Sequence, residues 1–433
     1  MEQGAQSHMV DISGTDRVTS PFAATSRLTL LLRSLSPGSF TRIAIEEAAG
    51  MGAVLSAEIP IVAFSAFSRG YRLEDLARER GVHITTVGGK TALSRLSKAI
   101  FGKIVPPHRD SESYLPVLEM MVWSVFGGQV GGVNYCEDQF VGLPALIRRA
   151  LNGTPYVLFV AEVISSPPQS GDTGFFGRGA RGVLFRWLLR RTESAILGHA
   201  AAIVFCSIRT RDELLRAFPD LRRVPSTVIY PGCNVVSSAL PPCDGAERYV
   251  LCVSKWDLGR HPEFALDLAR RVPVKVVLGG TWITQDAKVD FLRVVSACAG
   301  ELSGSVEVRD QLDEIELASL YSGAWVYIHW NPEGFGMGAL EAMARGIPVV
   351  CTESAGVGEL VVNHENGFLI DGRSVSDFAN AIENLLSNPE LRSRLSNGAL
   401  ESARAVRWEV HNQRLLSYLN IAQGQTDQES RRK

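Results

Sequence analysis

Residues 329–350 have the sequence HWNPEGFGMGALEAMARGIPVV, and this stretch decides the fold of the chain. The apolar run just before it, residues 325–328, predicts a buried strand. Residues 336–345 have helix-forming composition, and a glycine followed by a proline would end that helix. The apolar residues 349–351 then begin a second strand. The pattern predicts a strand–loop–helix–strand unit with one carboxylate in its loop and another in its helix.

The loop of this unit and the start of its helix have the features of an anion site. Free backbone N–H groups at a helix N-terminus carry a partial positive charge that attracts anions. Glycines at Gly334, Gly336 and Gly338 would let a ligand approach the backbone closely. Glu333 precedes the helix and Glu341 lies within it, so a diphosphate at the helix tip could present sugar hydroxyls to both. The alternative is structural: Glu333 would compensate the helix dipole, and Glu341 would be a solvated surface charge.

The same stretch resembles the glutamate-x7-glutamate signature of glycosyltransferase family 4. These are retaining nucleotide-sugar enzymes with two Rossmann-like domains, the GT-B fold. The likeness begins with EGFGMGALEAMARGIPVV and continues through Gly356, Glu359, Leu360, Gly367 and Phe368. It is strongest over roughly residues 248–400. The resemblance implies that Glu333 contacts the transferred sugar and that Glu341 holds the ribose of the nucleotide.

A second part of the expected site lies in residues 253–269, VSKWDLGRHPEFALDLA, just after a predicted strand. Ligands bind at the carboxyl ends of strands in open α/β sheets. The family has an Arg and then a Lys here, both facing the diphosphate, whereas this chain has Lys255 and then Arg260. Ser254 replaces the usual Gly, and His261 replaces the Gly after the second base. Charge is kept, but a Lys cannot reproduce a bidentate Arg contact. The structural alternative is a solvated surface pair.

The resemblance implies a retaining glycosyltransferase that moves a sugar from a UDP- or GDP-linked donor to a hydroxyl acceptor. We expect Glu333, Lys255 and Arg260 to be catalytic. We expect the donor to be held by Ser254, Gly334, Phe335, Gly336, Met337, Gly338 and Glu341. No Asp-x-Asp motif occurs, so we expect neither a metal nor any cofactor beyond the nucleotide-sugar. Two alternatives stay open: a catalytically silent sugar-nucleotide-binding partner subunit, and a GT-B sugar-nucleotide epimerase.

Composition sets the broad class of the protein. The chain has 433 residues, of which 45% are hydrophobic and 21% charged, as expected for a globular protein of two domains. A net charge of −2 does not favour a nucleic-acid partner. Seven cysteines without a C-x-x-C spacing favour a reducing, cytoplasmic location over a disulfide framework or a zinc site. No apolar run approaches the ~20 residues that a membrane span needs, and the N-terminus is expected to lack a signal-peptide h-region.

Short apolar runs alternate with helical segments along the chain, which predicts two parallel α/β domains. Together with the resemblance, this gives a GT-B fold whose two sheets face a central cleft and whose C-terminal helix crosses back to the first domain. The expected boundaries are a disordered 1–25, an acceptor-binding domain 26–235, a linker 236–247, a nucleotide-sugar-binding domain 248–405, a crossover helix 406–421 and a flexible tail 422–433. Expected strands are 28–35, 59–66, 83–87, 132–136, 155–163, 201–206, 249–253, 274–278, 306–308, 325–328 and 349–351. Within the first domain, 201–206 and a helix at 210–218 are expected to be the last elements.

The acceptor half has weaker signals. Many relatives have a His just after the strand expected at 155–163, but this chain has Glu162 there and no His between positions 109 and 198. Glu137, Asp138 and Glu162 could each bind an acceptor hydroxyl or be structural. Residues 175–196 are aromatic and basic, so they could contact an anionic membrane or a lipid-linked acceptor. The alternative is a domain helix with a solvated Arg face. The acceptor itself could be a glycan, a lipid-linked molecule or a small molecule.

Overall fold

The structure of the chain is a computed structural model. It describes residues 28–35, 39–66, 73–87, 92–101, 117–127, 132–164, 180–237, 248–256, 258–282 and 284–419. The predicted disorder of residues 1–25 and of the tail 422–433 lies outside these residues. Most of the predicted linker, residues 238–247, also lies outside them.

The first domain is built on a parallel seven-stranded sheet with the order β3-β2-β1-β4-β5-β6-β7. Its strands are β1 (Leu28–Leu35), β2 (Ile61–Ala66), β3 (Ile84–Thr86), β4 (Val133–Cys136), β5 (Tyr156–Val160), β6 (Ala202–Phe205) and β7 (Ser226–Val228). Its helices are α1 (Ser39–Leu55), α2 (Leu73–Glu79), α3 (Ala92–Phe101), α4 (Val117–Phe126), α5 (Gly142–Asn152), α6 (Ala180–Gly198) and α7 (Ile208–Ala217). The central strands β4, β5 and β6 are buried along their whole length, as parallel strands covered on both faces must be.

The second domain is built on a parallel six-stranded sheet with the order β10-β9-β8-β11-β12-β13. Its strands are β8 (Tyr249–Trp256), β9 (Lys275–Trp282), β10 (Ser305–Asp310), β11 (Ala324–His329), β12 (Val349–Thr352) and β13 (Gly367–Ile370). Its helices are α8 (Phe264–Arg271), α9 (Gln285–Cys298), α10 (Glu314–Ser322), α11 (Met337–Met343), α12 (Val375–Ser387) and α13 (Pro389–Arg404). Short 3-10 turns, η2 (Leu258–Arg260) and η4 (Gly356–Leu360), follow β8 and β12.

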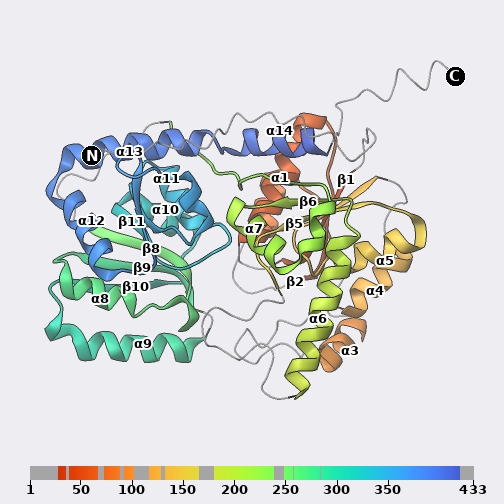
Figure 1. The fold of residues 1–433 in the computed structure, drawn as a ribbon, viewed down its shortest axis with the longest axis horizontal. Helices are drawn as coiled ribbons and strands as arrows, with labels where there is room; N and C mark the ends of the chain where they lie inside the picture. The colour runs from red at the N-terminus through yellow and green to blue at the C-terminus, as the bar shows by residue number, and fades with distance from the viewer. Residues whose placement is uncertain are drawn as a thin grey trace.

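Both sheets reverse their strand order at the same place. The reversal falls between β1 and β4 in the first domain and between β8 and β11 in the second. Such a reversal leaves a crevice outside the carboxyl ends of the two strands, where ligands bind in open α/β sheets. The two domains lie side by side in Figure 1, each a sheet covered by helices. This confirms the predicted pair of parallel Rossmann-like domains.

The C-terminal helices join the two domains. Figure 1 shows α13 running over the second domain and α14 (Trp408–Tyr418) continuing over the first. There α14 packs against α1, and a Cβ at Gly50 would overlap the Asn412 side chain, so only glycine allows this close approach. His411 and Glu47 face one another across the contact at 2.7 Å, both fully buried. The predicted crossover helix is therefore present and is bonded to the first domain.

Two strands of the structure were not predicted from the sequence. The structure adds β7 after α7, so 201–206 is not the last strand of the first domain. Among the described residues, α7 is the last α-helix before the second domain, as expected for 210–218. The structure also adds β13 beyond β12 in the second domain. Both are short strands at a sheet edge, where one side is unpaired. Sequence pattern missed them because three or four residues give too short a run to indicate a strand.

Candidate functional site

The loop between β11 and α11 is held by its neighbours on both sides. At its start, Asn331 donates its side-chain N–H to the Arg260 carbonyl oxygen at 2.8 Å, and the indole N–H of Trp330 donates to the same oxygen at 3.2 Å. Further on, the Gly356 amide donates to the Glu333 carbonyl oxygen at 3.0 Å. The loops that follow β8, β11 and β12 therefore form one bonded surface at the carboxyl edge of the second sheet.

Glu333 and Arg260 meet at the reversal point of this sheet. The Arg260 Nη2 atom lies 3.4 Å from Glu333 Oε1. Both side chains stay accessible, at 30% for Arg260 and 34% for Glu333. The structure thus brings together one acid and one base from the two predicted halves of the site, and it leaves both open to solvent. A ligand in the crevice could reach either group.

His329 is a member of this cluster to which sequence reasoning assigned no role. Its Nε2 atom lies 3.4 Å from Glu333 Oε2, and the ring is buried. Burial lowers the pKa of His329, the attraction of Glu333 opposes this shift, and Arg260 adds to it. The ring is therefore neutral at neutral pH beside an ion pair. A His at the carboxyl end of a strand, four residues before the loop Glu, was the available signal.

Lys255 and Ser254 belong to β8 itself, not to a loop after it. The strand was expected to end at Val253, but it continues to Trp256, and Lys255 pairs with Thr281 of β9. The cause is Trp256, which is fully buried and packs against Trp330 with the ring centroids 5.7 Å apart. Lys255 is exposed and Ser254 half-buried at the carboxyl end of the strand. Both face the same edge of the sheet as Arg260.

Contacts within the protein explain why glycine occupies two of the three positions, Gly334 in the loop and Gly338 in α11. A Cβ at Gly334 would overlap the Ala161 carbonyl oxygen of the first domain. A Cβ at Gly338 would overlap the Tyr327 hydroxyl, which donates to the Val253 carbonyl oxygen at 3.1 Å. Packing thus requires glycine at both positions, without any need for a ligand beside the backbone. Gly336 has a φ of 109°, a left-handed conformation in which glycine is strongly favoured, and it precedes α11.

Glu341 contacts an arginine of the other domain. Arg42 on α1 places Nη1 3.5 Å from Glu341 Oε1 and Nη2 2.7 Å from Glu314 Oε1. Sequence reasoning missed Arg42, because nothing in the residues around it points to a partner so far along the chain. The carboxylate expected to hold a ribose is therefore within reach of a cation from the first domain.

The carboxylates that follow strands of the first domain differ from one another in burial and in their contacts. Glu137 is fully buried, and burial together with Glu47 raises its pKa well above the ordinary value. Asp138 accepts the Val141 amide at 3.0 Å and lies 3.7 Å from Arg33. Glu162 is exposed. Of the three carboxylates left open by the sequence, Glu137 is buried, Asp138 is bonded to protein atoms, and Glu162 is accessible.

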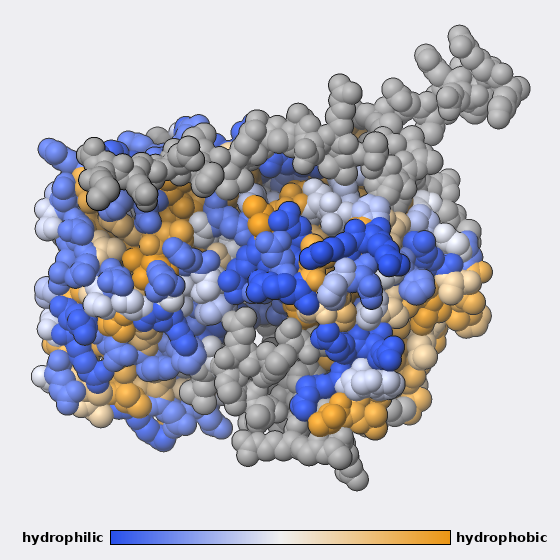
Figure 2. Space-filling model, viewed as in Figure 1, coloured by the Kyte–Doolittle hydropathy of each residue, from blue (hydrophilic) through white to orange (hydrophobic). Residues whose placement is uncertain are grey.

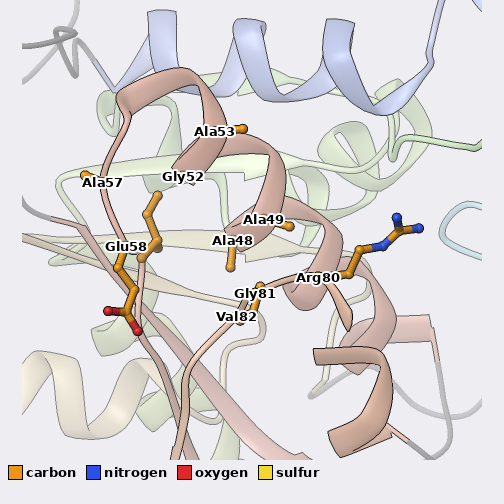
Figure 3. A pocket seen from close by; sticks show the side chains of 10 residues that line it. Ala48, Ala49, Gly52, Ala53, Ala57, Glu58, Arg80, Gly81 and Val82 are labelled. Atoms are coloured by element: carbon orange, nitrogen blue, oxygen red, sulfur yellow. The ribbon is translucent and has the colours of Figure 1, made fainter. Parts of the chain in front are cut away.

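Two hollows lie on the first domain. One, of about 230 Å³, is bordered by Ala48, Gly52, Glu58 and Arg80 on α1 and on the segments around β2 and β3 (Figure 3). It lies toward the amino end of β2, and Arg80 is paired with Glu46 at 2.9 Å. A smaller hollow lies at the carboxyl edge, lined by Arg33, Asp138, Gln139, Phe140, Ala161, Glu162 and Ile164. This second hollow adjoins Ala161, the residue against which Gly334 packs.

Neither a metal-binding cluster nor a membrane-spanning helix occurs in the part of the chain that the structure describes. Within those residues, no three His, Cys, Asp or Glu side chains gather closely enough to hold a metal ion. Across the same residues, no helix has the length and apolar character that crossing a membrane requires.

Comparison with known proteins finds a family model that matches the second domain. The family model for glycosyl transferases group 1 matches residues 246–402. A D-inositol 3-phosphate glycosyltransferase of Streptomyces bingchenggensis is 27% identical over 249 residues, which cover 50% of this chain and 52% of that protein. A glycogen synthase of Mycobacterium tuberculosis is 26% identical over 278 residues, covering 62% of this chain and 63% of the relative. The chain thus spans between half and two thirds of the length of these two relatives.

Solved structures show the same fold over 91% of the chain. Anabaena Alr3699/HepE in complex with UDP-glucose superposes with a TM-score of 0.68 at 17% identity, covering 91% of this chain and 99% of that one. The sucrose-phosphate synthase of Thermosynechococcus elongatus has a TM-score of 0.66 at 18% identity, covering 91% and 98%. The resemblance drawn from residues 333–350 is confirmed: the chain has a GT-B fold, and its residues 246–402 match the model of the glycosyl transferases group 1 family.

Proposed function

We propose that this protein is a retaining glycosyltransferase that moves a sugar from a UDP- or GDP-linked donor to a hydroxyl acceptor. The observation that carries the proposal is the accessible pair of Arg260 and Glu333 at the reversal point of the second sheet. That crevice is where open α/β sheets bind nucleotides. The pair offers a base for the diphosphate and an acid for the sugar.

The proposed reaction breaks the bond between the anomeric carbon and the diphosphate oxygen. Negative charge then builds on the leaving diphosphate, where Arg260, Lys255 and the backbone N–H groups near Met337 would stabilise it. Each charged hydrogen bond contributes about 1.5–3 kcal/mol. We propose that these groups serve in place of a divalent ion. Glu333 would hold the transferred sugar beside them.

Retention follows if the acceptor oxygen attacks the face that the leaving group vacates. The new bond joins the acceptor oxygen to the anomeric carbon, and a phosphate oxygen of the leaving group takes the acceptor proton. Glu341 would bind the ribose hydroxyls, as the family resemblance implies. The nucleotide would then share Glu341 with Arg42 or displace it, since the two side chains lie 3.5 Å apart.

We place the acceptor at the facing edge of the first domain. The small hollow lined by Arg33, Asp138 and Glu162 adjoins the loop that carries Glu333, through the contact of Ala161 with Gly334. A hydroxyl bound there would lie on the same side of the cleft as the reacting sugar. The acceptor class, whether glycan, lipid-linked or small molecule, stays a prediction.

A donor panel tests the proposal. Titration calorimetry against UDP-glucose, UDP-N-acetylglucosamine and GDP-mannose identifies the donor that binds. Release of UDP or GDP without added acceptor then measures slow donor hydrolysis. We expect binding and hydrolysis with at least one donor, and hydrolysis at least about tenfold slower in Glu333→Gln. Absence of binding to every nucleotide-sugar of the panel would contradict the proposal.

The same panel separates the enzyme from a silent binding subunit. The exchange of the usual Arg for Lys255 and the missing acceptor-side His favour that second candidate. It predicts donor binding with no hydrolysis and no transfer. An epimerase would instead convert the donor into a second nucleotide-sugar, which chromatography of the reaction mixture would detect.

Contact with a membrane surface also stays a proposal. On α6, Val183, Leu184, Trp187 and Leu188 are exposed, and α4 of the same domain exposes Met121, Val125 and Phe126. Figure 2 shows apolar surface along the flank that α4, α5 and α6 form. The exposed Arg191 supplies positive charge, whereas Arg190 is partly engaged, because it donates to the Ala217 carbonyl and lies over the Phe218 ring. Residues 175–179 of the predicted basic stretch lie outside the described residues.

Co-sedimentation with anionic liposomes tests the membrane proposal. We expect salt-sensitive binding that Trp187→Ser weakens. Equal recovery in the pellet with and without anionic lipid would contradict it. A cytoplasmic location likewise stays a prediction.

A further inference from the structure

We infer that Ser207 and Glu359 are positioning residues, through which the first domain holds the loop that carries Glu333. This inference rests on the proposed function, because it assigns Glu333 to the reacting sugar. The contact joins the corner between β6 and α7 to two loops of the second domain, and neither Ser207 nor Glu359 would touch the substrate.

The first connection ends on the carbonyl next to Glu333. The Ser207 hydroxyl donates to the Gly334 carbonyl oxygen at 2.7 Å, and the Thr210 hydroxyl lies 3.2 Å from the same oxygen. Ser207 is fully buried and also accepts the Thr210 amide at 3.0 Å as the N-cap of α7. Because the Ala161 carbonyl lies where a Cβ of Gly334 would be, the loop sits directly on the first domain. A serine that caps one domain's helix thus also binds the other domain's reactive loop.

The second connection places a carboxylate at the positive end of α7. Glu359 accepts the amide of Ile208 at 2.9 Å and that of Arg209 at 2.7 Å. The Tyr230 hydroxyl donates to the same carboxylate at 2.9 Å. Charge-assisted bonds to the amides of a helix N-terminus are among the stronger ones in proteins. Burial and the nearby Glu359 raise the pKa of Tyr230, so the phenol keeps the proton that it donates.

The loop of Glu359 is in turn bonded to the loop of Glu333. The Gly356 amide donates to the Glu333 carbonyl oxygen at 3.0 Å, and the Val357 amide donates to the Phe335 carbonyl oxygen at 2.6 Å. A Cβ at Gly356 would overlap the Gly334 carbonyl, so the two loops lie in direct contact. Movement of either loop away from α7 would therefore disturb the other.

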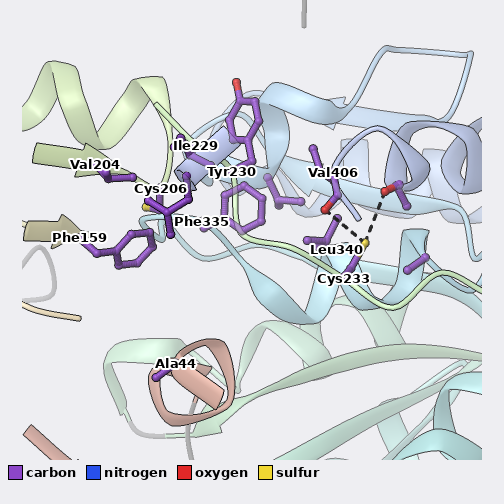
Figure 4. Packing of buried hydrophobic residues seen from close by; sticks show 14 of the residues in the cluster. Ala44, Phe159, Val204, Cys206, Ile229, Tyr230, Cys233, Phe335, Leu340 and Val406 are labelled. Carbon is purple, nitrogen blue, oxygen red and sulfur yellow. Dashed lines mark hydrogen bonds between the residues drawn. The ribbon is translucent and has the colours of Figure 1, made fainter. Parts of the chain in front are cut away.

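Apolar packing completes the contact between the two domains. The rings of Phe335 and Tyr230 are buried, with centroids 5.9 Å apart. Figure 4 shows Phe335 beside Tyr230, Ile229 and Cys206 of the first domain, within a buried cluster that includes residues of both domains. A continuous core resists sliding, because any shift would open a cavity. This side of the cleft is a fixed joint, and Glu333 projects from it.

The joint predicts a particular kinetic defect. Arg260, Lys255 and Glu341 belong to the second domain, so donor binding survives when the joint loosens. Glu333 would lose its exact placement relative to Arg260, and small misplacements of reacting groups lower turnover more than affinity. We expect Ser207→Ala to lower kcat by about five- to tenfold. The donor KM should stay within about twofold.

A double-mutant cycle tests whether Ser207 acts through Glu333. The cycle compares the wild type, Ser207→Ala, Glu333→Gln and the double variant, assayed with the donor of the panel that is hydrolysed fastest. We expect Ser207→Ala to change kcat by less than about twofold once Glu333 is already Gln. Equal losses in both backgrounds, or no loss in the wild-type background, would overturn the inference. Unchanged kcat in Glu333→Gln alone would instead overturn the proposed function.

Two further variants serve as a replacement for Ser207→Ala and as a control. Tyr230→Phe keeps the ring against Phe335 and removes one hydrogen bond to Glu359, so it replaces Ser207→Ala in the cycle if that variant does not fold. The same criteria then apply to it. Glu365→Gln is the matched control for charge on the second domain, since Glu365 is exposed, and it should leave kcat and KM unchanged.

Discussion

The two sheets reverse their strand order in the same way, but the ionisable side chains near the two reversal points differ in exposure to solvent. In the second domain, Arg260 and Glu333 each keep about a third of their side-chain surface accessible. In the first domain, Glu137 is fully buried just after β4, and Glu47 on α1 is fully buried against His411. Charge that remains in contact with solvent can bind a ligand, whereas charge withdrawn from solvent must be satisfied by the protein itself. The same topology therefore leaves charge accessible in one domain and withdraws it from solvent in the other.

The pair of Glu47 and His411 shows how the buried charge assembles the protein. The Nδ1 atom of His411 lies 2.7 Å from the Tyr230 carbonyl oxygen, which can only accept, so Nδ1 carries a proton. The contact of Nε2 with Glu47 at 2.7 Å then needs a further proton, on the ring or on the carboxyl. That shared proton joins the crossover helix to α1.

The largest expected effect comes from breaking this buried pair. We expect His411→Ala to lower the free energy of unfolding by about 3–5 kcal/mol, because it leaves Glu47 buried without its partner. Urea unfolding followed by circular dichroism measures the change. His199→Ala, at an exposed site, should change the value by less than about 0.5 kcal/mol. Equal stability of the two variants would show that the buried pair does not hold the crossover helix.

The accessible pair should affect turnover more than folding. We expect Glu333→Gln and Arg260→Ala each to lower the transfer rate by at least about tenfold, since each removes a preorganised charge at the reacting bond. Steady-state rates with the identified donor measure this, and thermal unfolding checks that the variants fold. The exposed Arg271→Ala is the matched control for Arg260. Wild-type rates in a folded Glu333→Gln variant would contradict a role of the accessible pair in turnover.

A smaller effect is expected from pH, because His329 is buried in a neutral form. Burial places its folded-state pKa below the ordinary value of 6.5, so the unfolded chain binds more protons between the two values. Its contribution to stability is therefore complete above about pH 6.5 and is lost as the pH falls from there toward the folded-state pKa. We expect His329→Gln to make unfolding less sensitive to pH between about 7.5 and 5.5. An unchanged pH dependence would mean that His329 is not buried as a neutral group.

The smallest effect is expected for Glu137. Burial and Glu47 raise its pKa well above the ordinary value, which favours the neutral form of the carboxyl. We expect Glu137→Gln to change the free energy of unfolding by less than about 1 kcal/mol, since one neutral group of similar shape replaces another. Urea unfolding at pH 7 measures it. A loss comparable with that of His411→Ala would show that Glu137 is ionised in the folded protein.

Much of the fold could be predicted because its signals are local. The buried strand before Glu333 and the helix after it follow from apolar runs and helix-forming residues within a few positions of one another. The ends of strands were harder, as β8 shows, because a buried Trp256 continues the strand past the polar Ser254 and Lys255. Burial of one side chain by distant partners decides such boundaries.

The sequence by itself determined the two-domain α/β architecture and placed Glu333, Arg260 and Glu341 in segments that bind ligands in such folds, because these features depend on spacing along the chain. The tertiary structure alone decided which groups meet. Ser207 reaches Gly334 across 127 positions, and Glu47 reaches His411 across 364. Contacts so distant in sequence leave no periodic trace, since they form only when both sheets have closed and their edges face one another.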